Sequence, residues 1–230
     1  MTNNPCSVLL RRFSSPLLAV VMVMAFSLSG LSGVAAEPPG STDELVDSLA
    51  SIETFAANFE QARIDSRGNV ARESAGKFAI ARPDRFHWRY ETPHVQELTA
   101  SGGTLWVYEP DLRQATRSPL DSGTAAPIAI LMGDRPIEDV FRIRELGRDD
   151  GELSWFALEP REESGDFREV LLGLDGSGLK EMRFIDQLDQ TTRVVLSQRQ
   201  FNRPVDDDRF RFDVPEGVDV VEAREPPRMQ

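Results

Sequence analysis

The chain of 230 residues contains a single cysteine, Cys6. A disulfide bond within one chain needs two thiols, and a structural zinc site of the usual kind needs several thiolate or imidazole ligands. Cys6 also lies in a leading segment that we expect to be removed. We therefore expect a mature protein without disulfides, without thiolate-bound zinc and without a lipid anchor on an amino-terminal cysteine.

Basic residues are outnumbered by acidic ones. The chain has 26 Lys and Arg against 38 Asp and Glu, a formal net charge of −12 at pH 7. Loss of the two arginines in the leading segment leaves 24 basic and 38 acidic residues, a net charge of −14. Such a charge repels phosphate backbones and anionic lipid headgroups over a Debye length of roughly 8 Å. Nucleic-acid binding is therefore not favoured.

Motifs of common enzymes are missing. The sequence holds neither a Gly-x-Ser-x-Gly nucleophile motif nor a Walker A phosphate loop. Its only histidines are His87 and His94, and the alternation around His87 puts that side chain on the polar side of a strand. The acidic run 206–208 lacks the spacing of a calcium loop. We expect no enzymatic activity, no cofactor and no metal site.

No apolar run is long enough to span a bilayer, yet the first 36 residues are typical of a secretory signal peptide. Two arginines precede an apolar run over residues 17–31, and small residues up to Ala36 offer a cleavage site before Glu37. The run contains Ser and Gly and is shorter than the roughly 20 residues that a spanning helix needs. We expect residues 1–36 to be cleaved and residues 37–230 to form one domain in the periplasm.

The hydrophobic pattern predicts one helix followed by many strands. The helix is expected over residues 43–52, with Ser41 or Thr42 as its N-cap. Segments of alternating polarity then predict strands over residues 55–62, 76–82, 86–90, 95–101, 104–109, 112–118, 140–147, 152–159, 167–174, 179–186 and 190–202. Regularly spaced short strands with Gly and Asp turns indicate a mainly β fold, an antiparallel sheet that curls toward a sandwich or barrel.

One apolar segment interrupts this series. Residues 127–133 have Pro127 at the expected first helical position and Gly133 at the expected stop. A short helix this apolar must be covered on most sides. We expect it to lie across the mouth of the curved sheet or inside it.

The stretch 81–93 concentrates aromatic rings and arginines. Because side chains alternate along a strand, Phe86, Trp88 and Tyr90 face one way and the neighbouring arginines face the other. Rings and cations therefore do not form one platform on which nucleic-acid bases stack. For any single ring, packing in a core remains the simpler interpretation.

As a set, the large apolar side chains favour a ligand cavity, because about two short helices are available to cover a sheet of many strands. The residues expected to line this cavity or its lid are Phe59, Phe78, Phe86, Trp88, Trp106, Ile128, Leu131 and Met132.

Arg82 lies, by the same alternation, on the face of Phe78 and Ile80. A guanidinium on an apolar face is costly unless acceptors satisfy its donors. Two interpretations stay open at this point: a rim residue whose charge reaches water, or a functional residue.

The sequence resembles the LolA family of periplasmic outer-membrane lipoprotein carriers over nearly the whole of residues 37–230. The resemblance rests on Gly76, Arg82-Pro83-x-x-Phe86-x-Trp88, Pro93, Gln96, Ser101-Gly102-Gly103, Leu105-Trp106-x-Tyr108-x-Pro110, Gln114-Ala115-Thr116, the apolar segment at Pro127, and Phe210-x-Phe212-x-x-Pro215-x-Gly217-Val218.

The resemblance implies an incomplete antiparallel β-barrel that encloses a hydrophobic cavity and is covered by short lid helices. It implies a monomeric chaperone that accepts the acyl chains of lipoproteins from the inner-membrane ABC transporter LolCDE. The receptor LolB at the outer membrane takes over the cargo where it is present. By the same resemblance, Arg82 is a latch that holds the lid closed when the cavity is empty.

Two alternatives remain at the level of the sequence. A periplasmic regulator of the same fold would sense lipid or lipoprotein rather than carry it. An enzyme acting on glycerophospholipid is the more distant alternative, because a nucleophile motif is missing.

Overall fold

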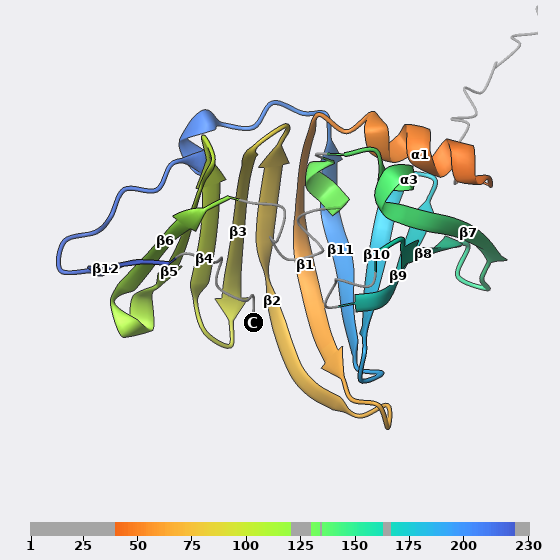
Figure 1. Cartoon of the computed structure of the whole chain (residues 1–230), viewed down its shortest axis with the longest axis horizontal. Coiled ribbons are helices and arrows are strands. Elements are labelled where there is room, and N and C mark those ends of the chain that lie inside the picture. The colour runs from red at the N-terminus through yellow and green to blue at the C-terminus, as the bar shows by residue number, and fades with distance from the viewer. Residues whose placement is uncertain (1–39, 121–129, 134, 163–166, 224–230) are drawn as a thin grey trace, which may run out of the picture. The chain divides into compact units, whose positions relative to one another are not determined.

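The computed structural model describes residues 40–120, 130–133, 135–162 and 167–223 (Figure 1). The expected signal peptide and Ile128 lie outside these ranges.

The expected first helix is confirmed as α1 (Thr42–Ala50), with Ser41 as its N-cap. The Ser41 side chain accepts a hydrogen bond from the Glu44 backbone N–H, and the Glu44 carboxylate accepts one from the Ser41 N–H. This capping box satisfies donors that the first turn leaves unpaired. Leu45 and Leu49 form the buried stripe of the helix.

Strands make up most of the described chain. They are β1 (Thr54–Ile64), β2 (Val70–Ala81), β3 (Arg85–Thr92), β4 (Gln96–Ser101), β5 (Thr104–Glu109), β6 (Gln114–Pro119), β7 (Phe141–Arg148), β8 (Ser154–Pro160), β9 (Phe167–Asp175), β10 (Gly178–Asp186), β11 (Thr191–Phe201) and β12 (Asp219–Glu222). Short helical turns are η1 (Pro110–Leu112), α3 (Ile137–Val140) and η2 (Asp207–Phe210), and residues 130–132 are helical as well.

Within the described residues, the strands form one sheet in the order β12-β6-β5-β4-β3-β2-β1-β11-β10-β9-β8-β7. Because β12 and β7 end this order without pairing to each other, the sheet is open, as expected for an incomplete barrel. Neighbours pair antiparallel with one exception: β12 lies parallel to β6. The expected antiparallel sheet is thus confirmed for the predicted strands, and β12, which the sequence pattern did not predict, adds one parallel strand at this edge.

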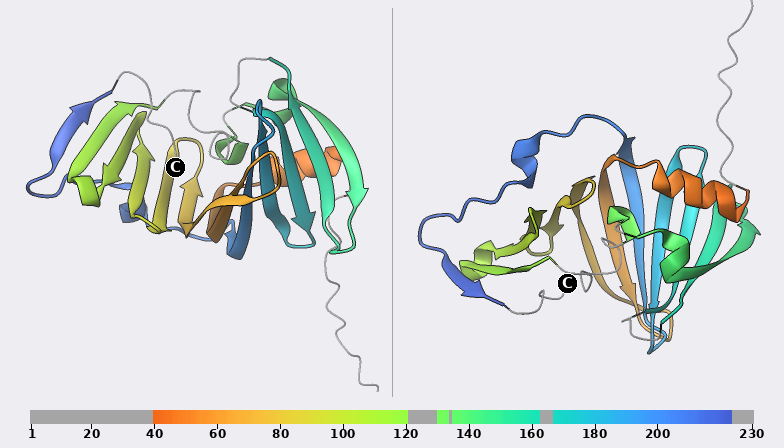
Figure 2. Two further views of the ribbon diagram at one scale, coloured as in Figure 1. Left: turned by 90° about the horizontal axis from the view of Figure 1, so that it is seen from below. Right: turned by 45° about the horizontal axis from the view of Figure 1, so that its top comes forward.

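The sheet is strongly curved and has an inner and an outer face (Figure 2). Leu45 and Leu49 of α1 and Leu131 of the helical residues belong to the same buried cluster as the inward side chains of the strands. Alternation along β3 places Phe86, Trp88 and Tyr90 in this cluster, as expected. α1 and the helical residues 130–132 therefore pack against the inner face, where apolar side chains predominate.

The segment after β11 crosses the outer face and returns the chain to the far edge of the sheet (Figure 1). Phe210 of η2 is buried against Ala79 and Ala81. Arg85 holds the same turn through an ion pair with Asp207 at 2.6 Å and lies 5.3 Å from the ring centre of Phe210.

Candidate functional site

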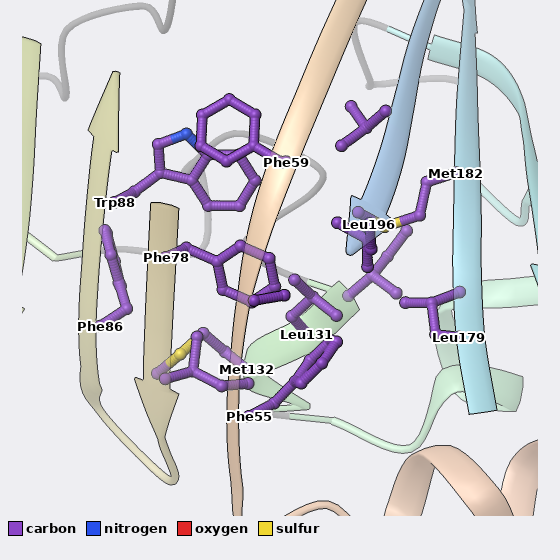
Figure 3. Packing of buried hydrophobic residues seen from close by; sticks show 14 of the residues in the cluster. Phe55, Phe59, Phe78, Phe86, Trp88, Leu131, Met132, Leu179, Met182 and Leu196 are labelled. Carbon is purple, nitrogen blue, oxygen red and sulfur yellow. The ribbon is translucent and has the colours of Figure 1, made fainter. Parts of the chain in front are cut away.

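Four aromatic rings from three adjacent strands form the centre of the inner face (Figure 3). The ring centres of Phe59 and Trp88 are 4.6 Å apart, those of Phe78 and Trp88 are 4.9 Å apart and stacked, and those of Phe55 and Phe78 meet edge to face at 5.0 Å. Offset and edge-to-face contacts of this kind add to the free energy of simple burial. The result is a continuous apolar surface across β1, β2 and β3.

The helical residues 130–132 pack onto this surface. Leu131 has no solvent exposure and Met132 is buried, and in Figure 3 both side chains lie beside Phe55 and Phe78. The apolar helical turn thus packs against the rings on the inner face.

Most of the residues expected in the site come together here. Phe59, Phe78, Phe86, Trp88, Leu131 and Met132 belong to one buried cluster. Sequence reasoning missed Phe55 and the inward residues of the later strands, such as Leu179, Met182 and Leu196. For Leu196 the signal was the alternation of its strand. Leu179 and Met182 lie three residues apart and share the inner face because the register shifts between Leu179 and Glu181, which alternation does not predict.

Trp106 does not join this cluster. Its neighbours Leu105 and Val107 face inward, whereas the Trp106 ring lies 5.3 Å from the ring of Phe212 and 5.8 Å from the Arg117 guanidinium. The ring is on the outer face because the segment after β11 supplies an aromatic cover there. The expectation that Trp106 faces the cavity is corrected.

Arg82 connects two helical segments. Its Nε and Nη2 donate hydrogen bonds to the Leu131 carbonyl oxygen at 3.0 and 2.9 Å. Its Nη1 donates to the carbonyl of Leu49 at 2.9 Å and to that of Ala50 at 3.4 Å. The last carbonyls of a helix have no partner in the helix and carry partial negative charge, so a cation is favourable there. The guanidinium thus joins the end of α1 to the apolar cover.

Gly133 gives this guanidinium its place. The residue has a backbone φ of +65°, and a Cβ added to it would lie 2.6 Å from Arg82 Cζ. Only glycine combines this left-handed conformation with the bare surface on which the guanidinium rests.

The α1 end of this connection is fixed to the sheet. Asn202 Oδ1 accepts hydrogen bonds from the Glu53 and Thr54 backbone N–H groups, and its Nδ2 donates to the Ser51 carbonyl. The Arg82 backbone N–H also donates to the Glu53 carbonyl at 2.9 Å. Because these hydrogen bonds hold the end of α1 on the sheet, Arg82 links residues 130–132 to the sheet through α1.

A small group of polar atoms lies at the other end of the ring cluster. Tyr90 Oη donates to Gln61 Oε1 at 3.4 Å, and both residues are buried. Burial raises the pKa of Tyr90 to about 12, while the polar groups of the neighbouring Trp88 and Gln61 act in the opposite direction. The Tyr90 hydroxyl is therefore a neutral hydrogen-bond donor at physiological pH.

Charged groups occupy the outer face of the same strands. Glu97 accepts hydrogen bonds from His87 Nε2 at 2.7 Å and Arg89 Nη1 at 2.9 Å. The hydrogen bond with His87, aided by Arg89, holds the pKa of Glu97 below its usual value. The charged groups of this network lie on the face of β3 opposite to the apolar side chains of Phe86 and Trp88.

Neither a metal cluster nor a membrane-spanning helix occurs in the described part of the chain. Its His, Cys, Asp and Glu residues form no group of three or more that is suited to hold a metal ion. None of its helices has the length and apolar character needed to cross a bilayer.

Comparison with known families decides the affiliation of this fold. Residues 50–213 match the family model described as "Outer membrane lipoprotein carrier protein LolA". The chain belongs to the LolA family. Because the match begins in α1 and extends past η2, it includes Arg82, the ring cluster and the cover.

Two LolA relatives match most of this chain. The outer-membrane lipoprotein carrier protein of Methylococcus capsulatus is 35% identical over 210 residues, which are 91% of this chain and 100% of the relative. The protein of the same name from Halorhodospira halophila is 38% identical over 215 residues, 91% of this chain and 95% of the relative.

A solved structure shares the fold at low sequence identity. An uncharacterized conserved protein from Thermus thermophilus superposes with a TM-score of 0.52 and 12% identity. The superposition covers 79% of this chain and 98% of the other.

Proposed function

We propose that this LolA-family chain is a periplasmic chaperone that binds the acyl chains of lipoproteins and delivers them to an outer-membrane receptor. The observation that carries the proposal is the covered apolar face: rings on the sheet, an apolar helical turn over them, and one arginine that connects this turn to α1. An acyl chain that displaced residues 130–132 would meet a ready apolar surface.

The proposed site consists of the lining residues Phe59, Phe78, Phe86 and Trp88 and the cover residues Leu131 and Met132, with Arg82 as latch. Ile128, expected beside the cover, lies outside the described residues. When acyl chains occupy the inner face, the cover is displaced and the hydrogen bonds of Arg82 to Leu131 break. When they leave, these bonds re-form.

The transfer free energies of acyl chains favour a carrier that works between a donor and an acceptor. Transfer of acyl chains from water gains about 0.8 kcal/mol per CH₂, so one 16-carbon chain gains roughly 12 kcal/mol, and a bilayer offers a similar gain. Non-covalent affinities reach at most about −20 kcal/mol. A binding protein therefore does not extract a multiply acylated lipoprotein unaided, and an energy-coupled donor is required.

This requirement and the printed names of the relatives support a donor of lipoproteins and an acceptor at the outer membrane. We propose the ABC transporter LolCDE as donor and LolB, where present, as acceptor, with the carrier acting as a monomer between them. Residues 1–36 serve as the signal peptide that exports the chain to the periplasm.

A carrier role needs no catalytic group, and we propose that the chain is not an enzyme. The alternative of a lipid-sensing regulator is not favoured, because the relatives that match nearly the whole chain are named carriers.

A release assay tests the proposal. Purified protein is added to spheroplasts that retain newly made lipoproteins in the inner membrane, and soluble lipoprotein is measured after sedimentation. We expect the wild-type chain to bring lipoproteins into the supernatant as a one-to-one complex. Their complete retention in the membrane would contradict the carrier role.

Two matched variants test whether the release of lipoprotein depends on the inner face of the sheet. Leu98→Gln places a polar amide on the inner face, whereas Leu188→Gln changes a leucine that is 70% exposed in a turn. With far-ultraviolet circular dichroism confirming that both are folded, we expect reduced release by the first and wild-type release by the second.

A further inference from the structure

The inner face of the sheet is divided into an apolar end and a polar end. Near Arg82 the inward residues of β1, β2 and β3 are apolar: Phe55, Phe78, Ile80 and Phe86. At the opposite end of the same strands and of β4, the inward residues are polar: Gln61, Ser74, Tyr90 and Gln96. The register places Gln61 opposite Ser74 and Tyr90 opposite Gln96.

These polar residues are buried rather than exposed at a rim. Tyr90 is 2% exposed and Gln96 is 4% exposed. Gln96 Oε1 has no hydrogen-bond partner within the described ranges. Buried polar atoms are nearly always paired in folded proteins, so an unpaired one calls for an explanation.

Trp88 stands at the boundary between the two ends. Its side chain is 1% exposed, and within the described residues its Nε1–H makes no hydrogen bond of normal geometry, although it lies near enough to the Tyr90 hydroxyl to lower the pKa of that group. In Figure 3 the indole nitrogen lies on the side of the Trp88 ring that faces away from Phe86 and Met132. An indole can only donate a hydrogen bond, so this site lacks an acceptor.

Tyr90 provides a second donor beside Trp88. The two ring centres are 6.3 Å apart, and the Phe59 ring contacts both, at 4.6 Å from Trp88 and 5.2 Å from Tyr90. The hydroxyl's own bond to Gln61 is 3.4 Å long, beyond the usual range for an O–H donor. A better acceptor placed between the two donors would replace this bond.

We propose that Trp88 Nε1 and Tyr90 Oη donate hydrogen bonds to the acyl ester carbonyl of the bound lipid, whose hydrocarbon tail runs toward Phe55 and Phe86. An ester carbonyl accepts hydrogen bonds and offers no donor, which matches two donors at the start of an apolar surface. This inference rests on the proposed function and adds the part of the lipid that is recognised and its direction in the site.

Two lipopeptides that differ only in the ester carbonyls test it. One is a cysteine peptide that carries a dipalmitoylglyceryl group. The other is its dialkyl ether twin, in which both ester carbonyls are methylene groups. Their affinities for the mature chain are measured by displacement of a fluorescent fatty acid. Since a hydrogen bond to a buried donor is worth about a factor of ten, we expect the ester to bind about tenfold more tightly than the ether.

Trp88→Phe and Tyr90→Phe each remove one donor and keep an aromatic ring. We expect each to reduce the ratio of ester affinity to ether affinity, whatever its effect on the affinity for the ether itself. Trp106→Phe is the matched control, because Trp106 lies on the outer face against Phe212. It retains the full preference. Thermal unfolding shows whether each variant is folded.

The outcomes separate the two proposals. Binding of both twins with equal affinity by the wild-type chain overturns the carbonyl contact and leaves the carrier role intact. If Trp88→Phe and Tyr90→Phe both keep the full preference for the ester over the ether, other atoms recognise the carbonyl, and this result also overturns the proposed contact. Failure of both twins to bind contradicts the proposed function itself.

Discussion

At the scale of single residues, the cover depends on a close fit between Arg82 and Gly133. The guanidinium bonds the Leu131 carbonyl and rests against the bare Cα of Gly133. In the carrier cycle proposed above, these contacts form only when the cover is closed, and they stabilise the empty state relative to the loaded one. We therefore expect a substitution of Arg82 or of Gly133 to destabilise the closed, empty state relative to the loaded state.

Gly133→Ala tests this balance without removing the arginine. The added Cβ would lie 2.6 Å from Arg82 Cζ, which displaces the guanidinium. Because closure then gains less free energy, we expect slower hand-over of bound lipoprotein to receptor-containing membranes. Arg82→Leu removes the hydrogen bonds to the Leu131 carbonyl altogether, and we expect it to slow hand-over in the same way. Transfer is measured as the fraction of lipoprotein that moves to the membranes with time.

Gly102→Ala is the control for backbone strain. Gly102 has a φ of +58°, and nothing lies within 4 Å of its added Cβ. Both variants lose about 1 kcal/mol of stability from the left-handed conformation, but only Gly133→Ala touches Arg82. Equal transfer by the two variants would contradict the latch.

At the scale of elements, α1 holds its position through Asn202 at the end of β11. The Asn202 side chain bonds Ser51, Glu53 and Thr54, and its backbone has a φ of +51°, which asparagine tolerates better than most residues. The link joins segments that are far apart in the sequence. It sets where the last carbonyls of α1 meet Arg82.

Asn202→Ala removes these hydrogen bonds and leaves a left-handed alanine. We expect the free energy of unfolding to fall by about 1–3 kcal/mol, measured by urea denaturation. We also expect faster amide hydrogen exchange in α1. Asn202→Asp keeps the two accepted bonds and loses only the donor, so its effect is smaller. An unchanged α1 in the alanine variant would show that other contacts fix the helix.

Most elements could be predicted from the sequence because local patterns determine them. Strands with one buried face, such as β3, show the alternation directly. β12 could not be found in this way: its four residues are all exposed, and its parallel partner β6 lies about a hundred residues earlier.

The residues of the candidate site could likewise be predicted only where local sequence patterns determine them. The rings of β1, β2 and β3 were predictable because several inward positions agree on one face. Alternation separates Trp106 from Leu105 and Val107, but ring size alone favoured the wrong face for Trp106. Its true surroundings come from Phe212, which only the folded chain brings there.

At the scale of the whole molecule, one half-buried and one buried carboxylate tie stability to pH. Glu97 on β4 is held by His87 and Arg89. For Glu181 on β10, burial raises the pKa, but hydrogen bonds from Arg193 and Arg183 outweigh it and lower the pKa below the usual 4.5. A depressed pKa in the folded state means that folding favours the ionised form.

The sign of the pH dependence follows. These groups contribute stability above their unfolded pKa of 4.5, and the contribution is lost as pH falls through the lower folded pKa. We expect the free energy of unfolding to decrease from about pH 5 downward. In Glu97→Gln the decrease is shallower, since one of the titrating groups is gone. Denaturation curves between about pH 3 and 7 measure both slopes. Parallel slopes would assign the pH dependence to other groups.

The open sheet has two edges, β7 and β12, and each unpaired strand edge is a template for a second chain. β7 carries exposed Arg142, Arg144 and Arg148, and β12 is exposed over its whole length with Asp219 and Glu222 at its ends. A strand of another copy that paired with a like edge would bring like charges together. The charges on each edge therefore disfavour the joining of two copies through the same edge of their sheets.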